Sequence, residues 1–452
     1  MSMAMDGRIG NGGLPRFRFS RRNLPAFLNC LIPAASWRAL AANDSRRADA
    51  RRRWSVKLSL LAWILMGWSG QSAATMRFAE ARDVIRRILY RRRRPGSCYQ
   101  GLVKASREWT PHLLRRLWRG LCAERLSRIT DAWRSAAWTV LTVDGSRFDA
   151  PRTRSNESML GSSGRDKAGP QWNVTLLMHL PTCLLWDWRA GRVTDDERGQ
   201  LREMLDDLPP RTLLVADAGF VGFDLMCELA SRDVTFLIRC GSNLRLLTDG
   251  SPARIERSGD LCVWHWPENR RFVLPLSLRL IVLSRGGRRM YLLTNELDAT
   301  RLPRGMARTL YEARWGVEVG YREIKQTLDR RKLLSRSPQS GEAELSAVIV
   351  AWGLLRLTAC MLLGRRVLRL SAAAALRAIR HGLELIRYDR ATGRFFAEMS
   401  GAQRDAYERR RSKRARRWPH KKKSRPPGAP ELRPMQPSDY ARIQRLMNAH
   451  PA

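Results

Sequence analysis

The pattern of hydrophobic and polar positions changes near residue 139. In 54–138, apolar residues recur three and four positions apart and arginines fill the remaining positions, which predicts amphipathic helices. Beyond this point, short apolar runs separated by turn-forming residues predict buried strands. The predicted order is strands at 140–144, 173–180 and 184–189, a helix at 194–207, a strand at 213–217, a helix at 223–231 and a strand at 235–239. We therefore expect an α/β core behind a helical N-terminal part.

The segment 240–306 has alternating character and predicts a mostly β insertion in this core. Its expected strands are 261–266, 271–274, 278–283 and 289–294. Trp264 and Trp266 lie two positions apart on one strand face, and we interpret them as core residues, with stacking on an unpaired base as the alternative. A helix is then expected to run to about residue 334, and a long apolar helix at 342–363 should pack under the sheet.

Charge indicates the class of partner. The chain has 83 Lys and Arg against 42 Asp and Glu, a formal net charge of +41. Such an excess repels itself unless a polyanion neutralises it, which favours nucleic acid. A membrane surface is the competing polyanion, but the longest apolar run, 58–68, is too short to span a bilayer and contains Ser59 and Gly67. We expect a cytoplasmic, nucleoid-associated protein with no membrane partner.

Cysteine and histidine give no metal pattern. The eight cysteines have no CxxC spacing and the six histidines are scattered, so we expect reduced core cysteines and no zinc site. Acidic residues are more informative. Asp144 and Asp217 each end an apolar run and precede small residues, and ligands of open α/β sheets bind at that end of a strand. A turn-initiating Asp is the alternative. The acidic run 195–197 competes for this role, although capping of a helix explains it without chemistry.

A predicted helix at 311–325 sorts its charged groups by face. At about 100° per residue, one stripe carries a single acid among cations and tyrosines, while Glu312 and Glu323 point elsewhere. The residues of the stripe are Tyr311, Arg314, Glu318, Tyr321, Arg322 and Lys325. Such a face suits a phosphodiester held beside a metal ion. The alternative is a surface helix with an ordinary pair between Arg314 and Glu318.

Asp144, Asp217 and Glu318 in this order, with Glu318 inside the spacing Y-x2-R-x3-E-x6-K, resemble the DDE transposases of the insertion sequence 4 family. The likeness covers about residues 140–360. It implies a ribonuclease H-like catalytic core interrupted by a β insertion before the catalytic helix. It also implies cut-and-paste transposition with strand transfer into target DNA, and leaves open whether a hairpin forms on the excised end.

The resemblance assigns roles to these residues. Asp144, Asp217 and Glu318 would hold two divalent ions, which the hard oxygen ligands indicate to be Mg2+, with Mn2+ as a substitute. Asp144 is our candidate for the ligand that bridges both ions. Phosphates of the transposon end would be bound by Tyr311, Arg314 and Lys325, together with Arg322, which the family motif does not require. The expected partner is double-stranded DNA, both transposon ends and target, with a dimer formed on DNA.

The expected domain organisation follows from these patterns. It comprises a disordered basic N-terminus (1–53), a helical DNA-binding domain (54–138), the core's first part (139–239), the β insertion (240–306), the core's second part with the catalytic helix (307–400) and a basic C-terminal tail (401–452). Three alternatives stay open at this point. They are a ribonuclease H-like nuclease that cuts without joining, a catalytically silent DNA-binding protein, and a basic structural protein of the nucleoid or ribosome.

Overall fold

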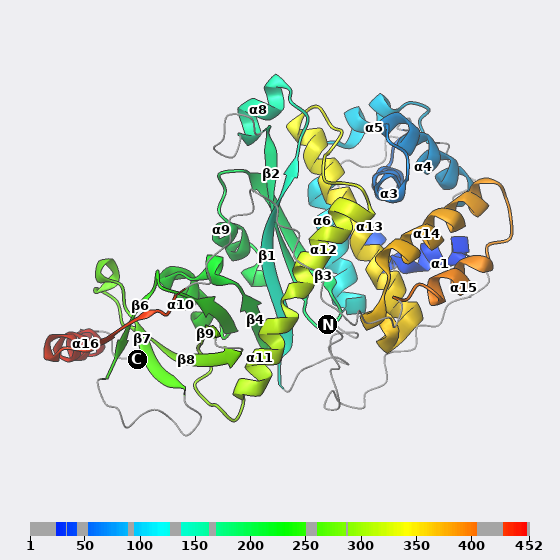
Figure 1. Ribbon diagram of the computed structural model, residues 1–452. Coiled ribbons are helices and arrows are strands. Elements are labelled where there is room, and N and C mark those ends of the chain that lie inside the picture. Colours follow the sequence, from blue (N-terminus) through cyan, green and yellow to red (C-terminus); the bar gives the residue numbers. More distant parts are fainter. Residues whose placement is uncertain are drawn as a thin grey trace, which may run out of the picture.

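One mixed sheet forms the centre of the computed structural model (Figure 1). The structure describes residues 24–32, 34–42, 53–88, 95–126, 137–161, 169–249, 260–285, 288–404 and 428–449. Ten strands of this described part pair in the order β10-β6-β7-β8-β9-β5-β4-β1-β2-β3. Their bounds are β1 Thr139–Asp149, β2 Gln171–His179, β3 Leu184–Arg192, β4 Thr212–Ala216, β5 Thr235–Cys240, β6 Arg245–Thr248, β7 Leu261–His265, β8 Leu276–Arg285, β9 Arg288–Thr294 and β10 Glu431–Pro434.

The predicted order of elements in the first part of the core is confirmed. β1 pairs antiparallel with β2 and parallel with β4, and β4 pairs parallel with β5. The helices α9 (Glu197–Arg202) and α10 (Phe223–Ser231) occupy the two predicted helical positions. β1 is longer than predicted, because it continues past its pairing with β4, which ends at Thr142↔Val215. Beyond that register β1 continues its pairing with β2, and Asp149 at its end forms a parallel bridge with Lys332.

The β insertion extends the same sheet. β9 pairs antiparallel with β5, and β8 and β7 follow in turn. The strand predicted at 271–274 is wrong, because these residues follow the short 3-10 helix η5 (Glu268–Arg270), where Phe272 is 65% exposed. Trp266 is a core residue, as interpreted, and its indole N–H donates to the carbonyl of Val273 at 2.7 Å. Trp264 is half-buried.

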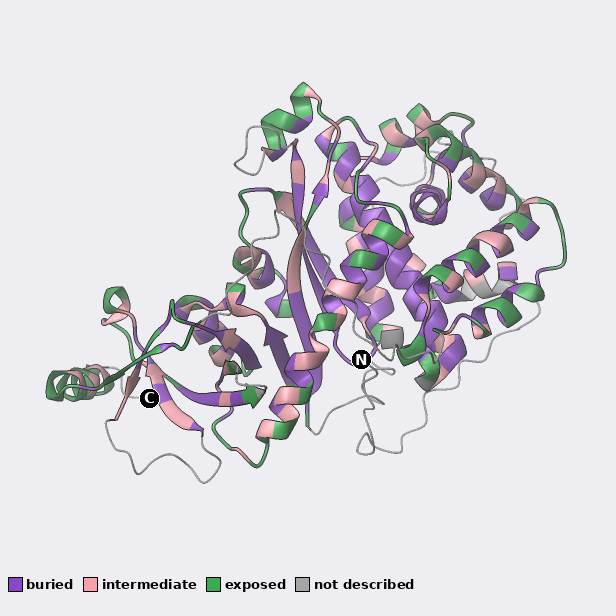
Figure 2. Cartoon of the chain, in the orientation of Figure 1, coloured by how far each residue is buried: buried purple, intermediate pink, exposed green. Residues whose placement is uncertain are grey.

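Helices cover the other side of the molecule, with α13 (Pro338–Leu363) as their centre. Among the described residues α13 alone is long and apolar enough to cross a bilayer, but 94% of its apolar window is buried inside the protein, as the purple ribbon in Figure 2 shows. α3 (Val56–Trp68) packs along it so closely that a methyl group at Gly67 would lie 2.7 Å from Cβ of Ala351. The N-terminal helices therefore share a core with the C-terminal ones.

The remaining helices complete this layer and the periphery. Their bounds are α1 Leu24–Leu31, α2 Ala34–Ala42, α4 Ala74–Ile88, α5 Tyr99–Ser106, α6 Thr110–Leu121, α8 Arg154–Leu160, α11 Arg304–Ala313, α12 Trp315–Arg322, α14 Ala372–Arg387, α15 Arg394–Ser400 and α16 Pro437–Ala449, with π-helices η1 Cys122–Leu126 and η6 Glu323–Thr327 and 3-10 helices η2 Leu205–Asp207, η3 Ala218–Phe220 and η7 Gly364–Arg369.

One expectation about the chain ends needs correction. Disorder does not hold for 24–32 and 34–42, because α1 and α2 bury Leu24, Leu31 and Leu40 against the helical core. Within the segment expected as a basic C-terminal tail, β10 pairs in parallel with β6 and α16 follows it. The basic run at 409–425 lies outside the described residues. The boundaries of the six predicted segments otherwise stay predictions.

Candidate active site

Asp144 and Asp217 lie just beyond the C-terminal end of the pairing between the parallel strands β1 and β4. Asp144 sits in β1 just beyond the pairing with β4, and its Oδ1 accepts a hydrogen bond from the backbone N–H of Gly145 at 2.9 Å. Asp217 directly follows β4 and caps the turn η3, with Oδ1 accepting from the N–H of Gly219 at 2.8 Å. The shared edge of the two strands thus presents both carboxylates.

Glu318 reaches this edge from α12, which packs on β1. The helix is fixed by Tyr321, whose hydroxyl lies 2.8 Å from the carbonyl oxygens of Asp144 and Val174 and accepts from the N–H of Leu176 at 3.0 Å. Tyr321 is 5% exposed, so its predicted place on a DNA-facing stripe is wrong. A tyrosine at this position joins the helix that carries Glu318 to the strand that carries Asp144.

The guanidinium of Arg314 brings the three carboxylates together. Its Nη2 lies 3.2 Å from Oε1 of Glu318, and its Nη1 lies 3.7 Å from Oδ2 of Asp144. It also interacts electrostatically with Asp217. Nε and Nη1 of Arg314 are buried, and the guanidinium also lies against the hydroxyl of Tyr311. A single cation therefore faces all three predicted acids.

The acids of this site are crowded. Burial raises the pKa of Asp144 to about 7; Arg314 opposes this rise, whereas the negative charges of Asp217 and Glu197 add to it. Glu197 begins α9, and burial together with Asp217 raises the pKa of its own carboxyl group. A fourth acid thus belongs to the same electrostatic neighbourhood. Such repulsion between like charges is relieved by a bound cation.

The interpretation of the acidic run 195–197 as a helix cap holds only in part. The side chain of Asp196 is the cap, accepting from the N–H of Gly199 at 2.5 Å, and Asp195 closes the preceding turn by accepting from the N–H of Arg192 at 2.7 Å. Glu197 makes neither contact and lies over Gly145 instead. The sequence does not predict this position of Glu197, because it depends on the tertiary packing of α9 against β1.

The predicted phosphate-binding residues divide into three environments. Tyr311 is buried beside Arg239 and Arg314, and burial raises the pKa of its hydroxyl. Lys325 is half-buried, donates from Nζ to Oγ of Ser146 at 2.7 Å, and has a pKa that burial lowers.

Arg322 points to solvent. Arg314 and Lys325 therefore contact residues of β1, whereas Tyr311 is buried and Arg322 is exposed.

Comparison with known proteins agrees with this geometry. Residues 139–354 match the family model of the transposase DDE domain. The chain is 26% identical over 362 residues to transposase InsG for insertion sequence element IS4 of Escherichia coli (strain K12), which covers 75% of this chain and 78% of that protein. Residues 139–354 are thus a transposase DDE domain, in a chain that is similar to the transposase of insertion sequence element IS4. DDE transposases use divalent metal ions.

Among solved structures, the chain is similar to the piggyBac transposase synaptic complex with hairpin DNA, which covers 83% of each chain at 13% sequence identity and a TM-score of 0.39.

A second anchor holds the catalytic helix of the transposase on α13. The buried carboxylate of Glu323 accepts from Nη2 and Nε of Arg356 at 2.7 and 2.9 Å, and from Nε1 of Trp352 at 2.9 Å. Glu323 points away from the stripe, as predicted, but its partner Arg356 could not be predicted from the sequence. Arg356 is an arginine inside an apolar helix, and its role depends on which helix packs against it.

The catalytic helix is also shorter than predicted. α12 passes into the π-helix η6, which ends at Thr327 and not near residue 334. Asp329 has a φ of 57°, which terminates the helix, and Arg330 then donates to the carbonyl oxygen of Ser69 at 2.7 Å. A π-helix rotates the residues behind it relative to an α-helix, so a constant angle per residue misplaces the later part of the motif.

The donor set suits a hard divalent ion. Carboxylate oxygens of Asp144, Asp217 and Glu318 are the ligands that Mg2+ and Mn2+ prefer, and their crowding favours a cation. Within the described ranges, however, three or more Asp, Glu, His or Cys side chains are nowhere assembled at metal-binding distances. The carboxylates instead surround Arg314, so drawing them around an ion requires local movement of these side chains.

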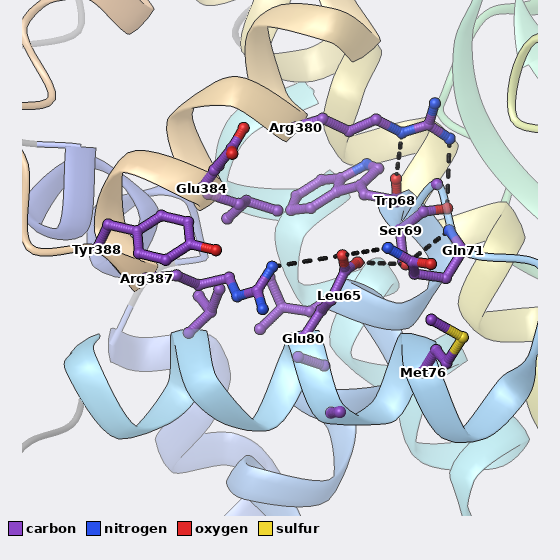
Figure 3. A pocket seen from close by; sticks show the side chains of 15 residues that line it. Leu65, Trp68, Ser69, Gln71, Met76, Glu80, Arg380, Glu384, Arg387 and Tyr388 are labelled. Atoms are coloured by element: carbon purple, nitrogen blue, oxygen red, sulfur yellow. Dashed lines mark hydrogen bonds and ion pairs between the residues drawn. The ribbon is translucent and has the colours of Figure 1, made fainter.

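A cavity of about 580 Å3 lies elsewhere, between α3, α4 and α14 (Figure 3). Trp68, Glu80, Arg380 and Arg387 are among its walls, and Arg380 donates from Nε to the carbonyl oxygen of Trp68 at 2.7 Å. None of its lining residues comes from β1, β4 or α12. The carboxylates thus lie outside this cavity, at the edge of the sheet.

Proposed function

We propose that this transposase carries out cut-and-paste transposition, cleaving at the ends of its own insertion sequence and joining the freed 3′ ends to target DNA. Mg2+ is the proposed ion, two per site, with Mn2+ as a substitute. The observation that carries the proposal is the position of Arg314, which faces Asp144, Asp217 and Glu318 together. Three acids around one cation at a strand edge supply the carboxylate oxygens that metal-assisted in-line displacement at phosphorus uses.

The residues of the chain have separate tasks. Asp144, Asp217 and Glu318 would hold the ions, and Asp144 must lose its proton to do so. Divalent ions held there would stabilise the attacking and leaving oxygens and would make water or a 3′-hydroxyl nucleophilic near neutral pH. Arg314, whose buried guanidinium lies between Asp144 and Glu318, would bind a phosphate oxygen beside them. Lys325 adds a positive charge beside Ser146.

The proposed partners are both transposon ends and a target duplex. The net charge of +41 supports DNA as the neutralising polyanion. Joining two ends to one target requires both ends in one assembly, so we propose a dimer that forms on DNA, in the nucleoid of the cytoplasm. A ribonuclease H-like core is proposed with it, supported by the adjacent strands β3-β2-β1-β4-β5, of which β4 and β5 run parallel to β1.

The test is Mg2+-dependent nicking of a labelled duplex that carries the element's own end. The intact protein is compared with Glu318→Gln, and Glu312→Gln on the preceding helix serves as the matched control, all at concentrations that give equal DNA binding. Nicking by the intact protein and the control, lost in Glu318→Gln, supports the proposal. A strand-transfer assay then shows whether the cut ends are joined. Cutting without joined product would favour a nuclease, and binding without cutting a silent DNA-binding protein.

A further inference from the structure

Glu197 begins α9 beside the catalytic carboxylates, and no role has been assigned to it. α9 contacts β1, which carries Asp144, and the turn η3, which Asp217 caps. Asp144 and Asp217 are both close enough to interact electrostatically with Glu197. The start of α9 therefore lies between the two strand ends that supply the aspartates.

The position of α9 is fixed from both sides. On the β2 side, Nδ2 of Asn173 donates to the carbonyl oxygen of Asp195 at 2.7 Å, and Nε2 of Gln200 donates to the carbonyl oxygen of Asn173 at 3.3 Å. On the side of the Asp217 loop, Nη1 of Arg198 donates to the carbonyl oxygen of Val221 at 3.1 Å. The first turn of the helix is thus tied to both neighbours of Glu197, which keeps its side chain directed at β1.

Gly145 makes room for this side chain. A methyl group at residue 145 would lie 1.9 Å from Oε1 and 2.1 Å from Cδ of Glu197, distances that real atoms do not tolerate. The Glu197 carboxylate therefore rests directly on the backbone of the residue after Asp144. Any other amino acid at residue 145 would push it away.

The carboxylate of Glu197 differs from its acidic neighbours in having no partner. Within the described residues it accepts no hydrogen bond and forms no ion pair, whereas the surrounding acids all do, namely Asp195, Asp196, Glu203 and Glu228. Arg147 on β1 acts on it electrostatically. The helix dipole favours an acid in the first turn of α9, but this preference does not require the side chain to lie over Gly145.

We propose that Glu197 is a fourth carboxylate ligand of the divalent-metal site, an inference that rests on the proposed function. The site would then receive Asp144 and Asp217 from two strand ends and one glutamate from each of two helices, α12 and α9, which both contact β1. Glu197 supplies a hard oxygen donor whose bonding capacity is unused by the protein. Gly145 serves as a positioning residue, because its missing side chain leaves the approach open.

The test measures Mn2+ binding by electron paramagnetic resonance in the full-length protein bound to an end duplex. Glu197→Gln removes the charge, whereas Glu197→Asp keeps the charge but shortens the side chain by one methylene group. A ligand is lost in both variants, and we expect each to weaken Mn2+ binding about 10-fold or more, the size of effect seen when groups supporting a metal site are removed. A purely electrostatic role would weaken binding only in Glu197→Gln. Nicking should return in both variants at higher Mn2+.

Two further variants complete the design. Gly145→Ala displaces the intact Glu197 and should weaken Mn2+ binding like Glu197→Asp, without further loss in the double variant. Glu157→Gln changes another glutamate in the first turn of a helix, α8, and is the control that should bind Mn2+ normally. Thermal unfolding confirms that each variant is folded.

The inference is overturned if Glu197→Asp binds Mn2+ like the intact protein, or if Glu197→Gln behaves like Glu157→Gln. Failure of the proposed function looks different. In that case the intact protein binds no Mn2+, or Glu318→Gln retains both binding and nicking. If Glu318→Gln loses Mn2+ while the Glu197 variants do not, the three-acid site stands and only the fourth ligand falls.

Discussion

The hydroxyl oxygen of Tyr321 lies 2.8 Å from the carbonyl oxygen of Asp144, one turn of helix after Glu318. Through the backbone of β1, this contact positions two of the carboxylates that we propose as metal ligands, Asp144 and Glu318. Tyr321→Phe should therefore lower the rate of end cleavage about 10-fold or more while DNA binding is unchanged, since small misplacements of catalytic groups have large effects on rate. Single-turnover nicking at saturating protein measures the effect.

Stability should respond to the same change. The N–H of Leu176 loses its acceptor, which costs about 1–3 kcal/mol of unfolding free energy. Tyr388 is 60% exposed, so Tyr388→Phe is a matched control that should leave both cleavage and stability unchanged. Equal cleavage rates for Tyr321→Phe and the intact protein would contradict a positioning role.

The buried pair between Glu323 and Arg356 should dominate the local stability of the catalytic helix. Removing one partner leaves the other charge buried without compensation, so Glu323→Ala should lower the free energy of unfolding by about 3–5 kcal/mol. The apolar double variant Glu323→Leu with Arg356→Met should recover most of this loss. Urea unfolding of the three proteins gives the comparison, and equal midpoints for single and double variants would argue against a coupled pair.

Asp144 should make stability depend on pH. Its folded pKa of about 7 lies above the usual unfolded value near 3.9, so the folded state holds the proton more tightly. Without metal, this group destabilises the fold as pH rises from about 4 to 7, and the effect is constant above 7. Asp144→Asn removes the penalty. Its melting temperature in EDTA should exceed that of the intact protein by an amount that grows from pH 5 to 7; a difference independent of pH would contradict the assignment.

The separation of Arg322 from Lys325 predicts different DNA phenotypes. Arg322 is exposed, so Arg322→Ala should reduce the salt dependence of DNA binding by about one phosphate contact and leave cleavage of bound DNA intact. Lys325 contacts Ser146 two residues from Asp144, and Lys325→Ala should also slow cleavage of bound DNA. Binding titrations across a range of salt concentrations, paired with nicking at saturation, distinguish the two. If both variants had the same salt dependence and the same cleavage rate, the different environments of Arg322 and Lys325 would have no functional effect.

The sequence predicted the strand ends well because they depend on local patterns. Asp144 and Asp217 were found as acids that close apolar runs, and both strands have this pattern because they are buried on two faces. Glu318 was found by the spacing of its motif and by helical period. These signals hold as long as the chain follows one regular geometry.

The remaining parts of the site depend on tertiary contacts. Tyr321 shares the helical stripe of Glu318 but is buried, because its hydroxyl lies against backbone groups of β1 and β2. Glu197 reads as a cap residue in sequence and reaches the carboxylates only because α9 packs over Gly145. The sequence does not identify Arg356 as the partner of Glu323, because the two residues lie 33 positions apart.

The C-terminal strand has a consequence for how the protein can be handled. β10 covers the outer side of β6, is exposed along its whole length, and carries Glu431 and Arg433. Short charged strands at a sheet border discourage other chains from adding to it. A version that ends at residue 404 would uncover β6, leaving a row of free backbone groups ready to template self-association. Loss of solubility on such shortening would reflect an unprotected sheet edge, and not damage to the carboxylates of the candidate active site.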